Sequence, residues 1–187
     1  MHEHMDWNDE TQSWDYVSSP DNVSIYGGAA DDSINNNIYR YRAGENVSIN
    51  GGAGNDQIYN SGSNNTILGN AGNDYISISG FNTTIFGGKG NDTLWIRVAG
   101  IVYVYKDGDG FDFIGGFGLL ETLVFDAAKY TTVKSGSDVL VNLGENTITL
   151  QGAASLSKVN IAKSIKAIAP VNVVTNYKSD VAINELD

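Results

Sequence analysis

Three copies of one nonapeptide follow each other in the stretch from Gly51 to Trp95. They read GGAGNDQIY at 51–59, GNAGNDYIS at 69–77 and GGKGNDTLW at 87–95, so each copy begins 18 residues after the one before it. A fixed period of this kind predicts a solenoid, in which each repeat packs on its two neighbours and stacking builds the core.

Two weaker copies flank the three complete ones. The sequence GGAADDSI at 27–34 has Ala30 where the other copies have a glycine, which would be strained if that position requires a positive φ. The sequence DGDGFD at 107–112 keeps both inner glycines and the final acid. Five loops therefore align, and their sixth-position carboxylates are Asp32, Asp56, Asp74, Asp92 and Asp112.

This pattern resembles the RTX calcium-binding repeats of hemolysin-type proteins. The resemblance implies an all-β fold, a right-handed parallel β-roll built from nonapeptides and closed by an antiparallel β cap at the C-terminal end. It also implies that two to four Ca²⁺ ions lie between loops of adjacent turns, each held by Asp side chains and by backbone carbonyls, because Ca²⁺ prefers six to eight oxygen ligands. The implied metal-binding residues are Gly27, Gly28, Ala29, Ala30, Asp32, Gly51, Gly52, Ala53, Gly54, Asn55, Asp56, Gly69, Asn70, Ala71, Gly72, Asn73, Asp74, Gly87, Gly88, Lys89, Gly90, Asn91, Asp92, Asp107, Asp109 and Asp112.

The nine residues between successive copies repeat as well, but without an acid. Where the loops above have Asp, these turns have Val23, Val47, Asn65 and Thr83. One position earlier, all of them carry asparagine, at Asn22, Asn46, Asn64 and Asn82. Asparagine tolerates the left-handed region and bonds to nearby backbone, so these residues predict a metal-free edge held by an asparagine ladder. The roll should therefore carry calcium along one edge only.

A column of aliphatic residues at the eighth position predicts the core. Each nonapeptide should form a six-residue turn and a three-residue strand whose aliphatic side chain points inward. The column consists of Ile25, Ile34, Ile49, Ile58, Ile67, Ile76, Ile85 and Leu94. The step from Gly27 to Gly51 is six residues too long, and this predicts a loop within 35–42.

The chain divides into four predicted segments. Residues 1–19 cap the N-terminal edge of the roll, 20–112 form the roll, 113–152 form the antiparallel cap, and 153–187 form a tail. Within the cap, Gly144-Glu145-Asn146 predicts a hairpin turn. The beginning of the tail is compatible with a short helix or with a strand pair.

Charge and composition narrow the choice of partners. The formal net charge is −11, most of the acids lie in the repeat half, and there is no cysteine. An acidic surface favours cations and repels nucleic acid. No apolar run reaches the ~20 residues of a membrane span. The polar, acidic start of the sequence lacks the pattern of a secretory signal peptide, which indicates another export route, such as type I secretion, or a piece of a longer chain.

Other readings of the motifs are less consistent with the residues. An EF-hand at 107–118 fails because Asp112 stands where that loop needs glycine and Gly118 where it needs glutamate. The histidines are His2 and His4 only, so the repeat region offers no Ser-His or Cys-His pair, and we expect no enzyme. Those two histidines suggest either a terminal metal site or a solvated terminus.

The predicted function is that of a secreted or cell-surface module that folds on binding calcium and supports a larger exported polypeptide. The alternative is a calcium-rigidified adhesive module that binds carbohydrate through outward-facing rings. Its candidate residues are Tyr26, Tyr59, Tyr75, Phe86 and Trp95.

Overall fold

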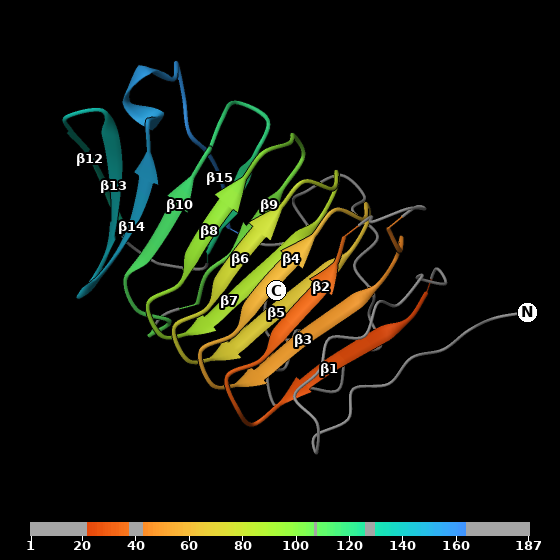
Figure 1. The fold of residues 1–187 in the computed structure, drawn as a ribbon. Helices are drawn as coiled ribbons and strands as arrows, with labels where there is room; N and C mark the ends of the chain where they lie inside the picture. The colour runs from red at the N-terminus through yellow and green to blue at the C-terminus, as the bar shows by residue number, and fades with distance from the viewer. Residues whose placement is uncertain (1–21, 38–42, 107, 126–129, 164–187) are drawn as a thin grey trace, which may run out of the picture.

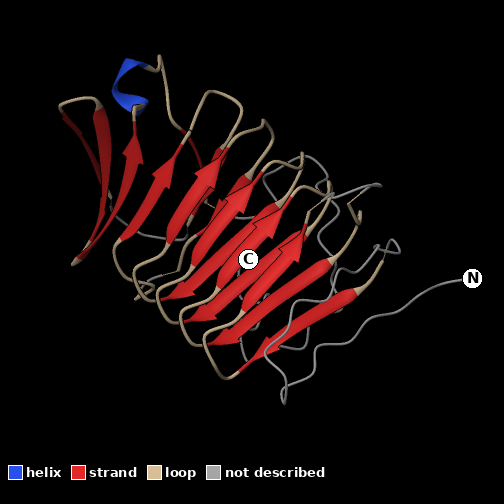
Figure 2. Cartoon of the chain, in the orientation of Figure 1, coloured by secondary structure: helices blue, strands red, loops and turns tan. Residues whose placement is uncertain are grey.

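The computed structural model describes residues 22–37, 43–106, 108–125 and 130–163 as an all-β fold (Figures 1 and 2). Two sheets run the length of the molecule, and each turn of the repeat contributes one strand to each sheet. The seven-stranded sheet contains, in spatial order, β1 (Ser24–Gly28), β3 (Ser48–Ala53), β5 (Thr66–Ala71), β7 (Thr84–Lys89), β9 (Val102–Val104), β11 (Thr122–Val124) and β15 (Asn160–Ala162). The eight-stranded sheet contains β2 (Ser33–Asn36), β4 (Gln57–Asn60), β6 (Tyr75–Ile78), β8 (Thr93–Ile96), β10 (Asp112–Gly115), β14 (Asn146–Gln151), β13 (Asp138–Leu143) and β12 (Thr131–Ser135).

The predicted parallel β-roll is confirmed by the strand register. In the eight-stranded sheet Ile58 lies beside Ile76 and Ile76 beside Leu94, and in the other sheet Ile49 lies beside Ile67. Every step is 18 residues, which is the period of the sequence. Identical positions therefore stack on identical positions along the roll.

The core lies between the two sheets. The inward column is fully buried from Ile49 to Leu94, whereas Ile25 in the terminal strand is only partly buried. These strands are longer than the three residues expected: β3 has six because its pairing extends into the glycine loop, and β4 has four because its pairing continues to Asn60. β2, β4, β6 and β8 each have a second inward position, occupied by Asn36, Asn60, Ile78 and Ile96 respectively.

Parallel pairing continues past residue 112, where we expected the roll to end. β10 pairs in parallel with β8, and β11 pairs in parallel with β9. The antiparallel pairs are β12–β13 and β13–β14, and the latter has its turn at the expected glycine, Gly144. β14 and β15 then return as parallel neighbours of β10 and β11, so the hairpin strands extend the sheets of the roll. The division of the chain at residue 112 stays a prediction.

The start of the tail contains both a helical turn and a strand. Ala153–Ser155 is a 3-10 turn that follows β14, and β15 comes next. Residues 1–19, the inserted residues 38–42, and 164–187 lie outside the described residues, and with them the predicted N-terminal cap and both histidines. Among the residues described, no helix is long and apolar enough to cross a membrane.

Candidate metal centre

The predicted calcium loops all lie along one edge of the roll, between a strand of the seven-stranded sheet and the next strand of the eight-stranded sheet. Gly54-Asn55-Asp56 connects β3 to β4, for example, and Gly72-Asn73-Asp74 connects β5 to β6. Because the strands are stacked in register, each loop lies directly on the loop one turn away. The sixth-position aspartates thus form a column, one per turn.

Glycine is required at the fourth loop position for two reasons. Gly72 has a φ of +132°, which side-chain-bearing residues rarely adopt, and a Cβ added there would overlap the carbonyl oxygen of Gly54 in the previous turn. Ala30 occupies this position in the first loop and is not among the described non-glycine residues with positive φ. The first loop therefore avoids the strain expected from the sequence by adopting a different backbone conformation at Ala30.

One oxygen of each carboxylate links neighbouring turns. Oδ1 of Asp74 accepts a hydrogen bond from the backbone N–H of Asp56 at 2.8 Å, and Oδ1 of Asp92 accepts one from Asp74 at 2.9 Å. The same bond joins Asp32 to Asp56 at 2.8 Å and Asp92 to Asp112 at 3.0 Å. All five carboxylates therefore belong to one ladder.

The other oxygen has no hydrogen-bond donor in three of these residues. Oδ2 of Asp56, Asp74 and Asp92 is buried and unpaired, and the three side chains are only 1–2 % exposed. A buried carboxylate oxygen without a partner is costly, since it has lost its hydration without gaining a hydrogen bond. A cation bound beside each of these three oxygens would therefore stabilise the folded chain.

A backbone carbonyl accompanies Oδ2 of Asp56 and Oδ2 of Asp74 above the first glycine of each loop. A Cβ added to Gly51 would meet Oδ2 of Asp56 and, at 3.0 Å, the carbonyl oxygen of Gly69 in the next turn. Gly69 has the same surroundings, with Oδ2 of Asp74 and the carbonyl of Gly87. Glycine leaves this space open, so a carboxylate and a carbonyl from adjacent turns converge on it.

Burial alters the protonation of the column. Desolvation raises the pKa of Asp74 to about 6 and of Asp92 to about 8, and it raises the pKa of Asp56 as well. Repulsion from neighbouring carboxylates acts in the same direction, while the hydrogen bond to each Oδ1 opposes it. Without a bound cation, the ionised carboxylates therefore destabilise the folded chain.

These residues fit calcium better than a transition metal. The available donors are carboxylate and carbonyl oxygens, which suit hard cations. In the described part of the chain, no three His, Cys, Asp or Glu side chains come together as a metal cluster. With one carboxylate per turn, a bound ion would take most of its ligands from backbone carbonyls.

The remaining predicted ligands differ in their surroundings. The side chains of Asn55, Asn73 and Asn91 accept hydrogen bonds from the backbone of the following turn, so only their backbone carbonyls are available to an ion. Oδ2 of Asp109 accepts a hydrogen bond from the Lys106 N–H at 2.7 Å. Asp107 lies outside the described residues.

The opposite edge has the predicted left-handed asparagines. Asn22, Asn46, Asn64 and Asn82 have φ between 53° and 66°. The side chain of Asn65 makes two hydrogen bonds here: its Oδ1 accepts the Val47 N–H at 2.8 Å, and its Nδ2 donates to Oδ1 of Asn60 at 2.8 Å. Asn60 also accepts from Asn36 at 2.7 Å. We did not predict this buried network from the sequence, although the asparagines at the second inward position, Asn36 and Asn60, could have indicated it.

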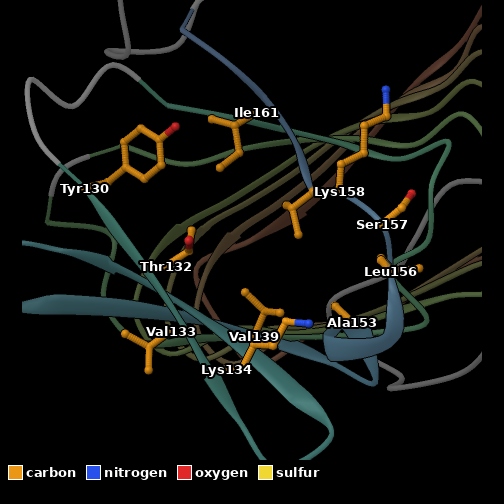
Figure 3. A pocket seen from close by; sticks show the side chains of 11 residues that line it. Tyr130, Thr132, Val133, Lys134, Val139, Ala153, Leu156, Ser157, Lys158 and Ile161 are labelled. Atoms are coloured by element: carbon orange, nitrogen blue, oxygen red, sulfur yellow. The ribbon is translucent and has the colours of Figure 1, made fainter.

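A groove of about 340 Å³ lies at the other end of the molecule from β1, beside the β12–β13 hairpin (Figure 3). Tyr130, Val133, Lys134, Leu156 and Lys158 are among its lining residues. None of the described residues that line it carries a carboxylate, and none belongs to the calcium loops.

One comparison with known proteins, a match to a repeat family, covers the calcium loops up to Asp92. The model of the RTX calcium-binding nonapeptide repeat matches four times, at residues 17–37, 44–67, 59–77 and 78–95. No curated protein matches the sequence. The extracellular lipase LipA from Serratia marcescens is a solved structure similar to this chain, with 16 % identity and a TM-score of 0.43 over 74 % of this chain and 37 % of the lipase. The chain thus spans little more than a third of that lipase. Four repeat matches, together with the stacked glycine loops and their carboxylate column, identify residues 17–37 and 44–95 as RTX calcium-binding nonapeptide repeats.

Proposed function

We propose that the chain is a calcium-dependent folding module of a larger exported protein. The observation that carries the proposal is the column of unpaired, buried carboxylate oxygens of Asp56, Asp74 and Asp92. A cation between the turns would neutralise these oxygens and would join each loop to the next. The module would then fold where calcium is abundant and stay unfolded where calcium is scarce.

The energetics favour a switch. A glycine-rich chain loses much conformational entropy on folding, and the apo column adds repulsion between carboxylates. Each ion that binds only the folded form contributes about 2.7 kcal/mol at a hundredfold excess over its Kd. Two to four ions would contribute as much as the ~5–15 kcal/mol stability of a typical domain. Extracellular calcium modules bind with Kd of roughly 10⁻⁴ to 10⁻³ M, which suits folding after export.

A calcium titration followed by circular dichroism tests this proposal. In excess EGTA the β signal should be largely absent, and it should appear cooperatively in the millimolar range of calcium. Magnesium at the same concentrations is the control, because it dehydrates reluctantly and demands octahedral geometry. A β signal that is complete in EGTA would show that calcium is not needed for folding.

Secretion and a parent polypeptide are part of the same proposal. The match to these repeats is evidence for a calcium-binding module of an exported protein. The role that we propose for the module is calcium binding and folding, without catalysis. A chain kept unfolded at low cytosolic calcium would be suited to passage through a type I exporter. Export of the parent protein, measured with and without the Asp74→Ala substitution, tests this step separately.

Carbohydrate binding is the second candidate, and a row of rings supports it. Tyr59, Tyr75, Trp95 and Phe113 lie half-buried on the outer face of the eight-stranded sheet, with Tyr59 tilted against Tyr75 and Trp95 edge-on to Phe113. Phe86 does not belong to this surface: it is 9 % exposed and packs in a separate apolar cluster. Glycan binding with and without calcium, compared between the wild type and Trp95→Ala, tests the alternative.

A further inference from the structure

The last gap of the ladder, between Asp92 and Asp112, is built differently from the others. In the inner gaps, the first glycine of a loop faces its own aspartate Oδ2 and the first carbonyl of the next turn. The final step of the ladder is 20 residues instead of 18, so the chain following Tyr105 does not continue in the same register. Among the described residues, the nearest atom of the following turn to a Cβ at Gly87 is the hydroxyl oxygen of Tyr103, whereas at Gly69 it is a backbone carbonyl.

The hydroxyl of Tyr103 lies in this gap beside Oδ2 of Asp92. A Cβ added to Gly87 would meet Oδ2 of Asp92 and, at 2.5 Å, the Tyr103 hydroxyl oxygen. Tyr103 pairs with Ile85 in the seven-stranded sheet and occupies the inward column that holds isoleucine in earlier turns. A phenol ring is longer than an isoleucine side chain, so its oxygen reaches from the core to the loop edge.

The hydrogen bonds leave one oxygen in this gap without a partner. Tyr103 donates its only hydroxyl proton to Oδ2 of Asp112 at 2.5 Å, and Oδ1 of Asp112 accepts the Asp92 N–H. Tyr103 therefore has no proton to give to Oδ2 of Asp92, which is buried and unpaired. Two carboxylates and a phenol oxygen with free lone pairs surround a space that needs a positive charge.

We propose that Tyr103 is a calcium ligand that completes a fourth ion site between Asp92 and Asp112. The phenol oxygen would be a neutral ligand beside Oδ2 of Asp92, and the two aspartates would supply the charge. This inference rests on the proposed function, because it assigns one of the ions that the folding switch requires. It explains why a core position carries a tyrosine at this turn.

Terbium provides a direct test, because Tb³⁺ substitutes for Ca²⁺ and its emission is sensitised by an aromatic side chain close to the ion. Tyr103→Phe should lower the sensitised emission of the Tb³⁺-loaded protein severalfold and reduce the calcium bound at saturation by one ion per chain. Tyr105→Phe is the matched control: the Tyr105 hydroxyl donates a hydrogen bond to the Gly110 carbonyl at 2.9 Å, and this variant should keep the full number of ions.

The outcomes separate this inference from the proposed function. An ion count that is unchanged in Tyr103→Phe, with unchanged terbium emission, would overturn the role of Tyr103 while leaving the folding switch intact. A wild-type protein that binds no calcium would overturn the proposed function itself. Should Tyr103→Phe fail to fold, Asp112→Asn removes the charge at nearly constant size and should also bind one ion fewer, and a full count there would contradict the fourth site.

Discussion

The two oxygens of Asp74 have different partners. Oδ1 receives the N–H of Asp56, which ties two turns together, while Oδ2 is buried and unpaired. The hydrogen bond to Oδ1 fixes the orientation of the carboxylate, and Oδ2 is left available to bind a cation. A single side chain therefore serves both the stacking of the turns and the proposed binding of calcium. Asp32, by contrast, is half-exposed and lies in the first loop, which has Ala30 at its fourth position.

Asp74→Ala should therefore impair calcium-induced folding more than Asp32→Ala. Asp74 borders two gaps that have complete motifs on both sides, whereas Asp32 borders only the first gap. We expect the calcium midpoint of folding, measured by circular dichroism, to rise at least tenfold for Asp74→Ala and only a few-fold for Asp32→Ala. Equal midpoints in the two variants would contradict the expectation that loops with complete motifs contribute more to calcium binding than the first loop does.

The same carboxylates predict an unusual pH dependence of the calcium-free protein. The pKa is raised to about 6 in Asp74 and about 8 in Asp92, mainly by burial, against about 3.9 for an unfolded aspartate. The folded chain thus holds more protons than the unfolded chain between these values, so stability falls as pH rises. In EGTA, the folded fraction should be larger near pH 5.5 than near pH 8.

With calcium present the trend should reverse, because protons compete with the ion for the carboxylates. Denaturant unfolding at several pH values, with and without calcium, measures both trends. A calcium-free stability that increases from pH 5.5 to 8 would contradict the burial of unpaired carboxylates.

At the scale of the element, the loops depend on backbone-to-backbone contact. The fourth-position glycine lies against a carbonyl of the previous turn, as at Gly72 and Gly54, so the spacing between turns leaves no room for a side chain. Hairpin glycines have a different role. Gly144 has a φ of +67°, and a Cβ added there would meet nothing within 4 Å.

Gly72→Ala and Gly144→Ala separate these two roles. Gly144→Ala carries only the cost of a left-handed alanine, about 1–2 kcal/mol. Gly72→Ala adds a clash with the Gly54 carbonyl at a φ that only glycine adopts readily, and should lower the free energy of unfolding in saturating calcium by more than about 3 kcal/mol. Chemical denaturation measures both variants. A cost for Gly72→Ala no larger than that for Gly144→Ala would contradict the close stacking of the loops.

The elements that could be predicted from the sequence are those that repeat. The spacing of Ile58, Ile76 and Leu94 predicts both the parallel register and the inward column, because a period of 18 places identical residues on adjacent strands. The position of the Tyr103 hydroxyl between Asp92 and Asp112 could not be predicted, since it depends on contacts between different turns of the roll. The return of β14 beside β10 is likewise a long-range pairing that no local pattern encodes.

At the scale of the whole molecule, the ladder converts local binding into cooperative folding. Each ion would lie between two turns, and the Oδ1 hydrogen bonds join every aspartate of the column to the next. No turn buries a core without its neighbours, so ordering one loop favours ordering the adjacent loop. Calcium should consequently act on the roll as a unit.

The dependence of stability on calcium concentration counts the ions that folding takes up. For ions that bind only the folded chain, each tenfold rise in calcium above Kd adds about 1.4 kcal/mol per ion to the free energy of unfolding. Two to four ions therefore predict about 3–6 kcal/mol per tenfold rise, and Tyr103→Phe should reduce the slope by the contribution of one ion. Urea unfolding at a series of buffered calcium concentrations gives the slope directly. A slope near zero would mean that calcium binds the folded and unfolded chains equally, and such binding could not drive folding however tight it was.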